Sequence, residues 1–235
     1  MLKLKTPTAV RAVYPSLTDK HVLVTGGGAG IGEALVEAFA RQGARVLFID
    51  ILDSPSHDLV ERLSGDVAHA PLYRYCDLRD IEAIRQTIAD VEREQGAIDI
   101  LVNNAANDDR HSIDDITPEY WDDRIAVNLR HQFFAAQAVV PGMRRSGGGA
   151  IINLGSISWH LALADLVLYQ TAKAGIEGLT RALARDLGPD NIRVNTIVPG
   201  NVQTPRQMQW YTPEGEKEIV AAQCLEDRIQ PDAVA

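Results

Sequence analysis

Tyr169 and Lys173 lie four residues apart in the stretch YQTAKAGIEGLTRALARDLG, whose apolar residues have the spacing of an amphipathic helix. Residues at positions i and i+4 share one helix face, so the phenol and the ammonium are expected to point to the same place. A free tyrosine has a pKa of about 10 and is mostly protonated at neutral pH. A cation about 4 Å away contributes roughly 4 kcal/mol at an effective dielectric of 20, which would lower that pKa by about three units. The pair is therefore a candidate base for removing a hydroxyl proton.

The elements that must position this pair alternate between short apolar runs and longer helical patterns. The expected strands cover residues 21–25, 45–50, 72–77, 98–105, 149–156 and 191–200, and the expected helices cover 31–42, 80–95, 117–145 and 168–187. Apolar strands separated by helices predict a parallel sheet with helices on both faces. We therefore expect an α/β fold, a Rossmann-type doubly wound parallel sheet in a single domain at 18–235, after an N-terminal arm at 1–17. Such folds bind ligands at the carboxyl ends of their strands.

The sequence TGGGAGIG, residues 25–32, follows the first expected strand and leads into a helix. Glycines at this junction let the backbone turn sharply and approach a pyrophosphate, which the positive end of the helix then stabilises. The spacing differs from the usual GxGxxG, and a simple tight turn is the alternative. The candidate cofactor-binding residues of this turn are Gly26, Gly30, Ile31 and Gly32.

Two acidic residues end the next two expected strands. Asp50 lies where a carboxylate would accept hydrogen bonds from the adenosine ribose hydroxyls. Neither the following Ile51 nor the glycine turn offers a cation for a 2′-phosphate, which favours NAD over NADP as the cofactor. Asp77, followed by Leu78, lies where its carboxylate could accept a hydrogen bond from an adenine amino group. The alternative role for Asp77 is the N-cap of the helix that follows it.

Motifs spread along the chain resemble, in their order, the classical short-chain dehydrogenase/reductase family. They are TGGGAGIG at 25–32, CDL at 76–78, NNAA at 103–106, Asn128, GSIS at 155–158, Tyr169-x3-Lys173 and PG at 199–200. The resemblance covers about residues 18–235. It departs from the family at Ala106, where glycine is usual. It also departs at the C terminus, because members continue from a segment like QPDAVA to a last strand; that C-terminal strand is expected to be absent here.

The resemblance implies roles for further residues. Ser156 would hydrogen-bond the substrate oxygen, and Asn128 would hold a water molecule that links Lys173 to solvent. Lys173 would also bind the nicotinamide ribose, and the positive nicotinamide ring would help it keep Tyr169 ionised. The remaining cofactor contacts would come from Asn103, Asn104, Ala105, Pro199, Gly200, Val202 and Thr204.

A narrower likeness, in the segments at 107–111, 155–160 and 199–225, resembles the branch of the family that oxidises aldopentoses at C1. It implies NAD-dependent oxidation of a sugar, D-xylose first, to its lactone. The expected sugar contacts are Asn107, His160, Gln170 and Asn201, beside Ser156 and Tyr169. Asp108, Trp159, Gln207 and Trp210 also lie near the expected crevice, and residues 205–225 are expected to form a mobile lid.

Composition limits the partners. The formal net charge of -9 repels phosphate backbones and anionic lipid, so we expect no nucleic-acid or membrane partner. Cys76 and Cys224 lack zinc-ligand spacing and fit a reducing cytoplasm, and we expect no metal. The resemblance implies a homotetramer. Three alternatives stay open: a dehydrogenase of another aldose, such as L-arabinose, L-fucose or D-galactose, a reductase for a ketone, and a catalytically silent NAD-binding sensor.

Overall fold

Six parallel strands form one sheet in the order β3-β2-β1-β4-β5-β6. The computed structural model describes residues 12–209 and 211–235, so most of the expected arm and Trp210 lie outside the described residues. The strands are β1 His21–Thr25, β2 Arg45–Asp50, β3 Leu72–Tyr75, β4 Ile100–Asn103, β5 Gly149–Leu154 and β6 Ile192–Ile197. All six expected strands are confirmed. The strand order reverses between β1 and β4, and this switch point opens a crevice at the carboxyl ends of the strands.

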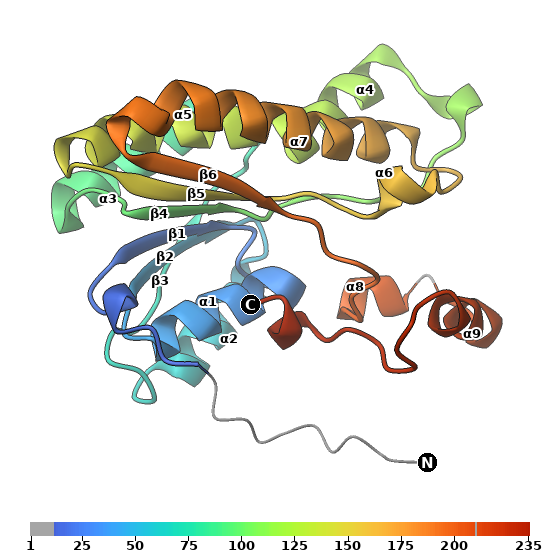
Figure 1. Cartoon of the computed structure of the whole chain (residues 1–235), viewed down its shortest axis with the longest axis horizontal. Coiled ribbons are helices and arrows are strands. Elements are labelled where there is room, and N and C mark those ends of the chain that lie inside the picture. Colours follow the sequence, from blue (N-terminus) through green and yellow to red (C-terminus); the bar gives the residue numbers. More distant parts are fainter. Residues whose placement is uncertain (1–11, 210) are drawn as a thin grey trace.

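Helices cover both faces of the sheet (Figure 1). On one face lie α3 Ile81–Gln95, α5 His131–Arg145 and α7 Val167–Leu187; on the other lie α1 Gly30–Arg41 and α2 Asp53–Leu63. The shorter helices are α4 Pro118–Ile125, α6 Ser158–Leu161, α8 Pro205–Met208 and α9 Pro213–Ala221. Single 3-10 turns occur at Pro15–Leu17, Ile113–Asp115, Gly188–Asp190 and Pro231–Ala233. This arrangement confirms the doubly wound α/β fold.

The strands feed two separate cores because successive side chains point to opposite faces of the sheet. Leu23 and Leu47 pack into the core under α3 and α5, whereas Val22, Val24 and Phe48 pack into the core under α1 and α2. All five side chains are at most 2% exposed. Full burial of such a side chain contributes about 1.5–3 kcal/mol, so the two cores fix the position of the strand ends.

Two helical features differ from the expectation. The sequence of α2 buries only Ser56, Leu59 and Leu63, which is too sparse an apolar pattern to predict a helix, and none was expected there. The single helix expected at 117–145 is interrupted by a π-helical turn at Ala126–Arg130, between α4 and α5. Such turns carry an extra residue and are frequent at functional sites.

The C-terminal segment returns to α1 after α9 (Figure 1). Val202 pairs with Ile229 in an isolated parallel bridge, and Val234 packs against the core under α1. No helix within residues 12–209 and 211–235 is long and apolar enough to span a bilayer.

Candidate active site

The glycine turn between β1 and α1 is shaped by contacts that exclude side chains. Gly26 has a φ of +65°, and a Cβ added to it would lie 2.7 Å from the Cα of Ala105. A Cβ on Gly32 would lie 1.8 Å from the carbonyl oxygen of Gly26. The Asn104 side-chain amide donates to that same oxygen at 2.9 Å and to the Thr25 carbonyl at 3.1 Å. The turn is thus held in one shape above the N-terminus of α1, where an anion is stabilised.

Asp50 ends β2 and is only 8% exposed. Its carboxylate accepts hydrogen bonds from the backbone N–H groups of Gly28, at 2.8 Å, and Leu52, at 2.9 Å. A carboxylate has about four acceptor positions, so Asp50 keeps capacity for two more donors. Ile51 and Leu52 flank it with apolar side chains. The position therefore suits a pair of ribose hydroxyls.

Asp77 follows β3 and forms an ion pair with Arg79 at 2.6 Å. Hydrogen bonding from this guanidinium holds the pKa of the Asp77 carboxyl below its ordinary value. The N-cap of α3 is Asp80, which accepts from two backbone N–H groups of the first turn. The alternative role of Asp77 as that N-cap is therefore wrong. Leu78 beside it is 6% exposed and joins the core.

These residues line one groove across the carboxyl end of the sheet, here named the glycine groove. Its lining includes Gly26, Ile31, Gly32, Asp50, Asp77, Leu78, Asn104, Ala105 and Thr204. Gly30, with a φ of +59°, faces Thr204, to whose Cγ2 an added Cβ would be 3.4 Å away. Three features of this groove fit a dinucleotide: the glycine turn, which has no room for a Cβ, the N-terminus of α1, which stabilises an anion, and the Asp50 carboxylate, which has acceptor positions to spare. Asn103 does not join them, because its buried amide donates to the Asn153 side chain at 2.9 Å.

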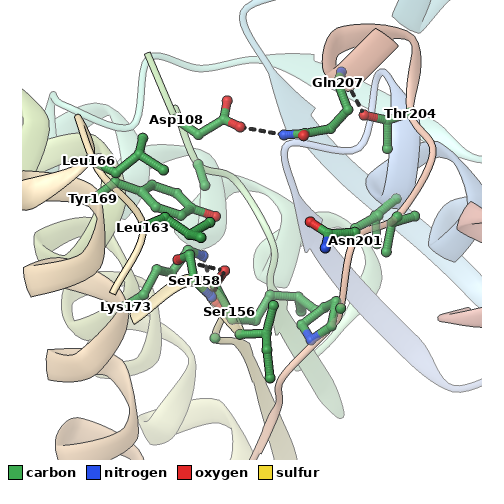
Figure 2. A pocket seen from close by; sticks show the side chains of 18 of the residues that line it. Asp108, Ser156, Ser158, Leu163, Leu166, Tyr169, Lys173, Asn201, Thr204 and Gln207 are labelled. Atoms are coloured by element: carbon green, nitrogen blue, oxygen red, sulfur yellow. Dashed lines mark hydrogen bonds between the residues drawn. The ribbon is translucent and has the colours of Figure 1, made fainter. Parts of the chain in front are cut away.

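Tyr169, Ser156 and Lys173 meet in an adjoining cavity, here named the tyrosine pocket (Figure 2). Ser156 follows β5, while Tyr169 and Lys173 come from α7, so the expected shared helix face is confirmed. The Ser156 hydroxyl donates to the Ser158 hydroxyl at 2.9 Å, and Ser156 acts to lower the pKa of Tyr169. Lys173 is 2% exposed and donates to the Leu154 carbonyl at 2.7 Å, with its Nζ 5.4 Å from the centroid of the Tyr169 ring.

The pKa values of this pair run against the simple expectation. Burial, followed by the charge of Asp108, raises the pKa of Tyr169 above its ordinary value. Burial lowers the pKa of Lys173 to about 8. The protein by itself therefore keeps the phenol protonated, because burial and the charge of Asp108 outweigh the opposing effects of Ser156 and Arg206 on its pKa. Ionising Tyr169 needs further positive charge in the pocket.

Asn128 lies in the π-helical turn and is 1% exposed. Its Oδ1 accepts from the backbone N–H of Asn107 at 2.8 Å, and its Nδ2 donates to the Asn107 carbonyl at 3.0 Å. This reciprocal pair fixes the loop that follows β4. The geometry gives Asn128 a positioning role for that loop, and the expected water contact stays a prediction.

The segment after β6 forms the opposite wall of the tyrosine pocket. Pro199, Gly200, Val202 and Thr204 all line it. The Pro199 carbonyl accepts from the backbone N–H of Ile157 at 3.1 Å, which ties this segment to the Ser156 loop. Thr204 also caps α8 and lines both cavities. The expected cofactor residues of both cavities thus lie on one continuous surface.

The expected sugar contacts divide in two. Asn201 lines the tyrosine pocket and Asn107 lines the glycine groove. His160 instead stacks on Trp159, and both side chains hydrogen-bond to Glu177, away from the pocket. Gln170 donates to the Leu163 carbonyl. Gln170 follows Tyr169 on α7, and neighbouring residues of a helix point in different directions. Neither His160 nor Gln170 lines the tyrosine pocket, so the structure does not support a sugar contact for either.

The tyrosine pocket is completed by Asp108 and Gln207, which were expected near the crevice, and by Leu163, Leu166 and Tyr211, which the sequence did not single out. Its apolar wall comes from Leu163 and Leu166, and its polar rim includes Asp108, Gln207 and Tyr211. Gln207 and Tyr211 are four residues apart, the same spacing that revealed the Tyr169 and Lys173 pair. Their segment is short, however, and carries no apolar stripe that would predict which way these side chains point.

A parallel doubly wound sheet with a glycine turn, an acid after β2 and a Ser-Tyr-Lys cluster defines a dinucleotide-dependent oxidoreductase fold and site. The family model described as short chain dehydrogenase matches residues 20–215. The chain therefore belongs to the short-chain dehydrogenase family. It is an oxidoreductase acting on CH–OH groups, in a family whose members use nicotinamide cofactors.

Named relatives cover nearly the whole chain. It is 61% identical over 224 residues to D-xylose 1-dehydrogenase of Caulobacter vibrioides, covering 95% of this chain and 88% of the relative. It is 50% identical over 220 residues to a probable galactose dehydrogenase, GalD, of Rhizobium meliloti, covering 93% and 86%. Among solved structures, a 7α-hydroxysteroid dehydrogenase complexed with NADH superimposes with a TM-score of 0.88 at 29% identity, covering 93% and 85%. The likeness thus extends beyond the fold to sugar dehydrogenases.

Proposed function

We propose that this protein oxidises an aldopentose, D-xylose first, at C1 to the sugar lactone with NAD as the oxidant. The observation that carries the proposal is the 61% identity over 95% of the chain to a protein named D-xylose 1-dehydrogenase. The tyrosine pocket supports it, since its rim offers neutral and acidic hydrogen-bonding groups suited to a small polyol. Most of the chain's own catalytic groups, Ser156, Tyr169 and Lys173, line that pocket.

In the proposed reaction a bound nicotinamide dinucleotide supplies the hydride acceptor. Ser156 hydrogen-bonds the C1 hydroxyl oxygen, and Tyr169 takes the hydroxyl proton. Tyr169 accepts this proton as a phenolate and becomes a neutral phenol; before the transfer Lys173 stabilises the phenolate, since a charge close by in a water-poor pocket acts strongly. Asn128 holds the Asn107 loop in place beside the reacting centre. Together the four residues orient the substrate hydroxyl, accept its proton and hold the surrounding loop in place.

The preference for NAD rests on the charge around Asp50. A carboxylate that is 8% exposed and faces the glycine groove would repel a 2′-phosphate. The neighbouring Ile51 and Leu52 add no cation. The same carboxylate can accept hydrogen bonds from two ribose hydroxyls. We therefore assign NAD, and not NADP, to this chain.

The test follows NADH absorbance with D-xylose, L-arabinose, L-fucose, D-galactose and D-glucose, and repeats the best substrate with NADP. We expect turnover with a preference for D-xylose and for NAD. Tyr169→Phe should keep NADH binding and lose turnover by about 10²–10⁴-fold, the contribution of a positioned base. Turnover retained by Tyr169→Phe would exclude it as the base, and silence across the sugars with NADH still bound would favour the sensor.

A second substrate has a specific observation in its favour. The 50% identity to a probable galactose dehydrogenase covers 93% of the chain, so D-galactose is the runner-up. The panel separates the two, because a pocket that fits a pentose must find room for one further hydroxymethyl group. A higher kcat/KM for D-galactose than for D-xylose would select the runner-up.

A further inference from the structure

Asp108 stands between the two cavities. It lines both the tyrosine pocket and the glycine groove, and its side chain is 18% exposed. The neighbouring Asp109 is 46% exposed and lines neither cavity. In Figure 2 the Asp108 carboxylate lies across the pocket from Ser156, with the Tyr169 ring between them. Of two adjacent acids, only one is placed to meet a ligand.

The α8 segment holds this carboxylate as an acceptor. Arg206 Nε donates to Asp108 Oδ1 at 2.6 Å, and Gln207 Nε2 donates to Oδ2 (Figure 2). Tyr211 in turn donates its hydroxyl hydrogen to Gln207 Oε1 at 2.7 Å. The chain of donors from Tyr211 through Gln207 to Asp108 is directional, and it fixes the orientation of the amide. Every bond in it points toward the carboxylate.

The carboxylate keeps unused capacity. Each oxygen accepts one hydrogen bond from the protein, whereas a carboxylate has about four acceptor positions in all. One position per oxygen is left over. Two neighbouring hydroxyls of a sugar ring present two donors side by side, which match the two oxygens of one carboxylate. Hydrogen bonds to a charged acceptor are roughly twice as strong as neutral ones.

We propose that Asp108 determines sugar specificity by accepting hydrogen bonds from adjacent ring hydroxyls remote from C1, with Gln207 and Tyr211 as the residues that position it. The inference rests on the proposed function, and it names the part of the pocket that selects the substrate. Arg206 balances the charge of Asp108, so the acid remains tolerable near Tyr169, whose ionisation it otherwise opposes. A substrate without these hydroxyls leaves a carboxylate position unpaired.

The experiment compares the preferred aldose with its 2-deoxy, 3-deoxy and 4-deoxy analogues at saturating NAD. In the wild-type protein at least one analogue should lose about 10- to 100-fold in kcat/KM, the range for a hydrogen bond to a charged group. In Asp108→Ala the parent sugar should fall to the level of that analogue, and the penalty for removing the hydroxyl should shrink below about threefold. Asp108→Asn, which keeps one acceptor, should restore part of the difference.

Asp109→Asn is the matched control. Asp109 also pairs with Arg206, at 2.6 Å, and lines neither cavity, so this variant weakens a comparable charged contact to α8 and leaves the Asp108 carboxylate in place. It should keep the wild-type penalties. NADH titration and thermal unfolding of every variant establish that the fold and the cofactor site persist.

Three outcomes overturn the inference in distinguishable ways. Asp108→Ala with undiminished deoxy penalties removes Asp108 from sugar recognition. Loss of NADH affinity in Asp108→Ala with an unchanged deoxy pattern assigns the carboxylate to the cofactor. Absence of turnover by the wild-type protein with every aldose overturns the proposed function itself, and the inference with it.

Discussion

Lys173 and Tyr169 show how burial governs the chemistry of single residues. Lys173 is fully buried and Tyr169 is half-buried, and desolvation pushes each toward its neutral form: the pKa of Tyr169 rises, and the pKa of Lys173 falls to about 8. Tyr169 can therefore act as a base only after positive charge enters the pocket and favours its ionised form. This interpretation predicts a pH dependence of stability.

Between a folded-state pKa of about 8 and the ordinary value of 10.5, the unfolded chain binds more protons at Lys173 than the folded chain does. The free energy of unfolding should therefore gain a rising contribution as pH increases from 8 to 9.5. Urea unfolding of wild type and Lys173→Met at pH 7, 8, 9 and 9.5 measures the difference. Lys217→Met, which removes an exposed ammonium, is the control. Curves for wild type and Lys173→Met that stay parallel would contradict the shift.

At the scale of elements, turns and short connections carry the site while the long elements carry the stability. The glycine turn, the Asn107 loop and the segment from Pro199 to Thr204 meet above a sheet whose two cores fix the strand ends. Within the glycine turn, a Cβ added to Gly32 would lie 1.8 Å from the carbonyl oxygen of Gly26. That oxygen belongs to the backbone, so no side chain can move aside to relieve the clash.

Gly32→Ala should therefore abolish detectable NADH binding and destabilise the fold by about 1–3 kcal/mol, the usual cost of overpacking. Gly178→Ala is the matched control, because Gly178 lies inside α7 and an added Cβ meets no atom within 4 Å. The control should be neutral or slightly stabilising. NADH fluorescence titration and urea unfolding measure both effects. Normal NADH binding by Gly32→Ala would show that the turn does not hold the dinucleotide.

At the scale of the whole molecule, apolar side chains remain exposed on the helical layer formed by α4, α5 and α7 (Figure 1). Trp121 is 45% exposed, Phe133 is 39% exposed and Val167 is 44% exposed. Scattered exposed apolar residues are ordinary, but three on one layer are consistent with an interface between copies. The homotetramer expected from the family resemblance would use this layer.

We expect a tetramer mass by native mass spectrometry, and a smaller assembly for Phe133→Glu, since a charge buried in an interface is costly. Val13→Glu serves as control, because Val13 is 77% exposed and its neighbours Ala12 and Tyr14 hydrogen-bond to Gln42 at the end of α1, outside the layer of α4, α5 and α7. Its mass should match that of the wild type. A monomeric wild type would rule out the tetramer, and an unchanged mass for Phe133→Glu would move the interface elsewhere.

The sequence by itself determined the fold class and the meeting of Tyr169 and Lys173 in one pocket. All six strands follow from their apolar runs, because strands buried on both faces need continuous apolar residues. Tyr169 and Lys173 follow from helical spacing, and the glycine turn follows from its place between a strand and a helix. Each of these features depends on residues close together in the sequence, so the side-chain periodicities of helices and strands are enough to predict it.

Only the tertiary structure decided the substrate end and the ionisation of the pair. His160 and Gln170 were expected at the sugar but are not in the lining of the tyrosine pocket. Gln207, whose amide accepts from Tyr211, reaches Asp108 from a segment about 100 residues further along the chain. The π-helical turn that positions Asn128 could not be predicted from the 3.6-residue spacing of apolar side chains, which indicates only a continuous helix. Burial reversed the expected pKa of Tyr169. Side-chain direction in loops and desolvation both depend on contacts between distant segments, and these exist only once the chain has folded.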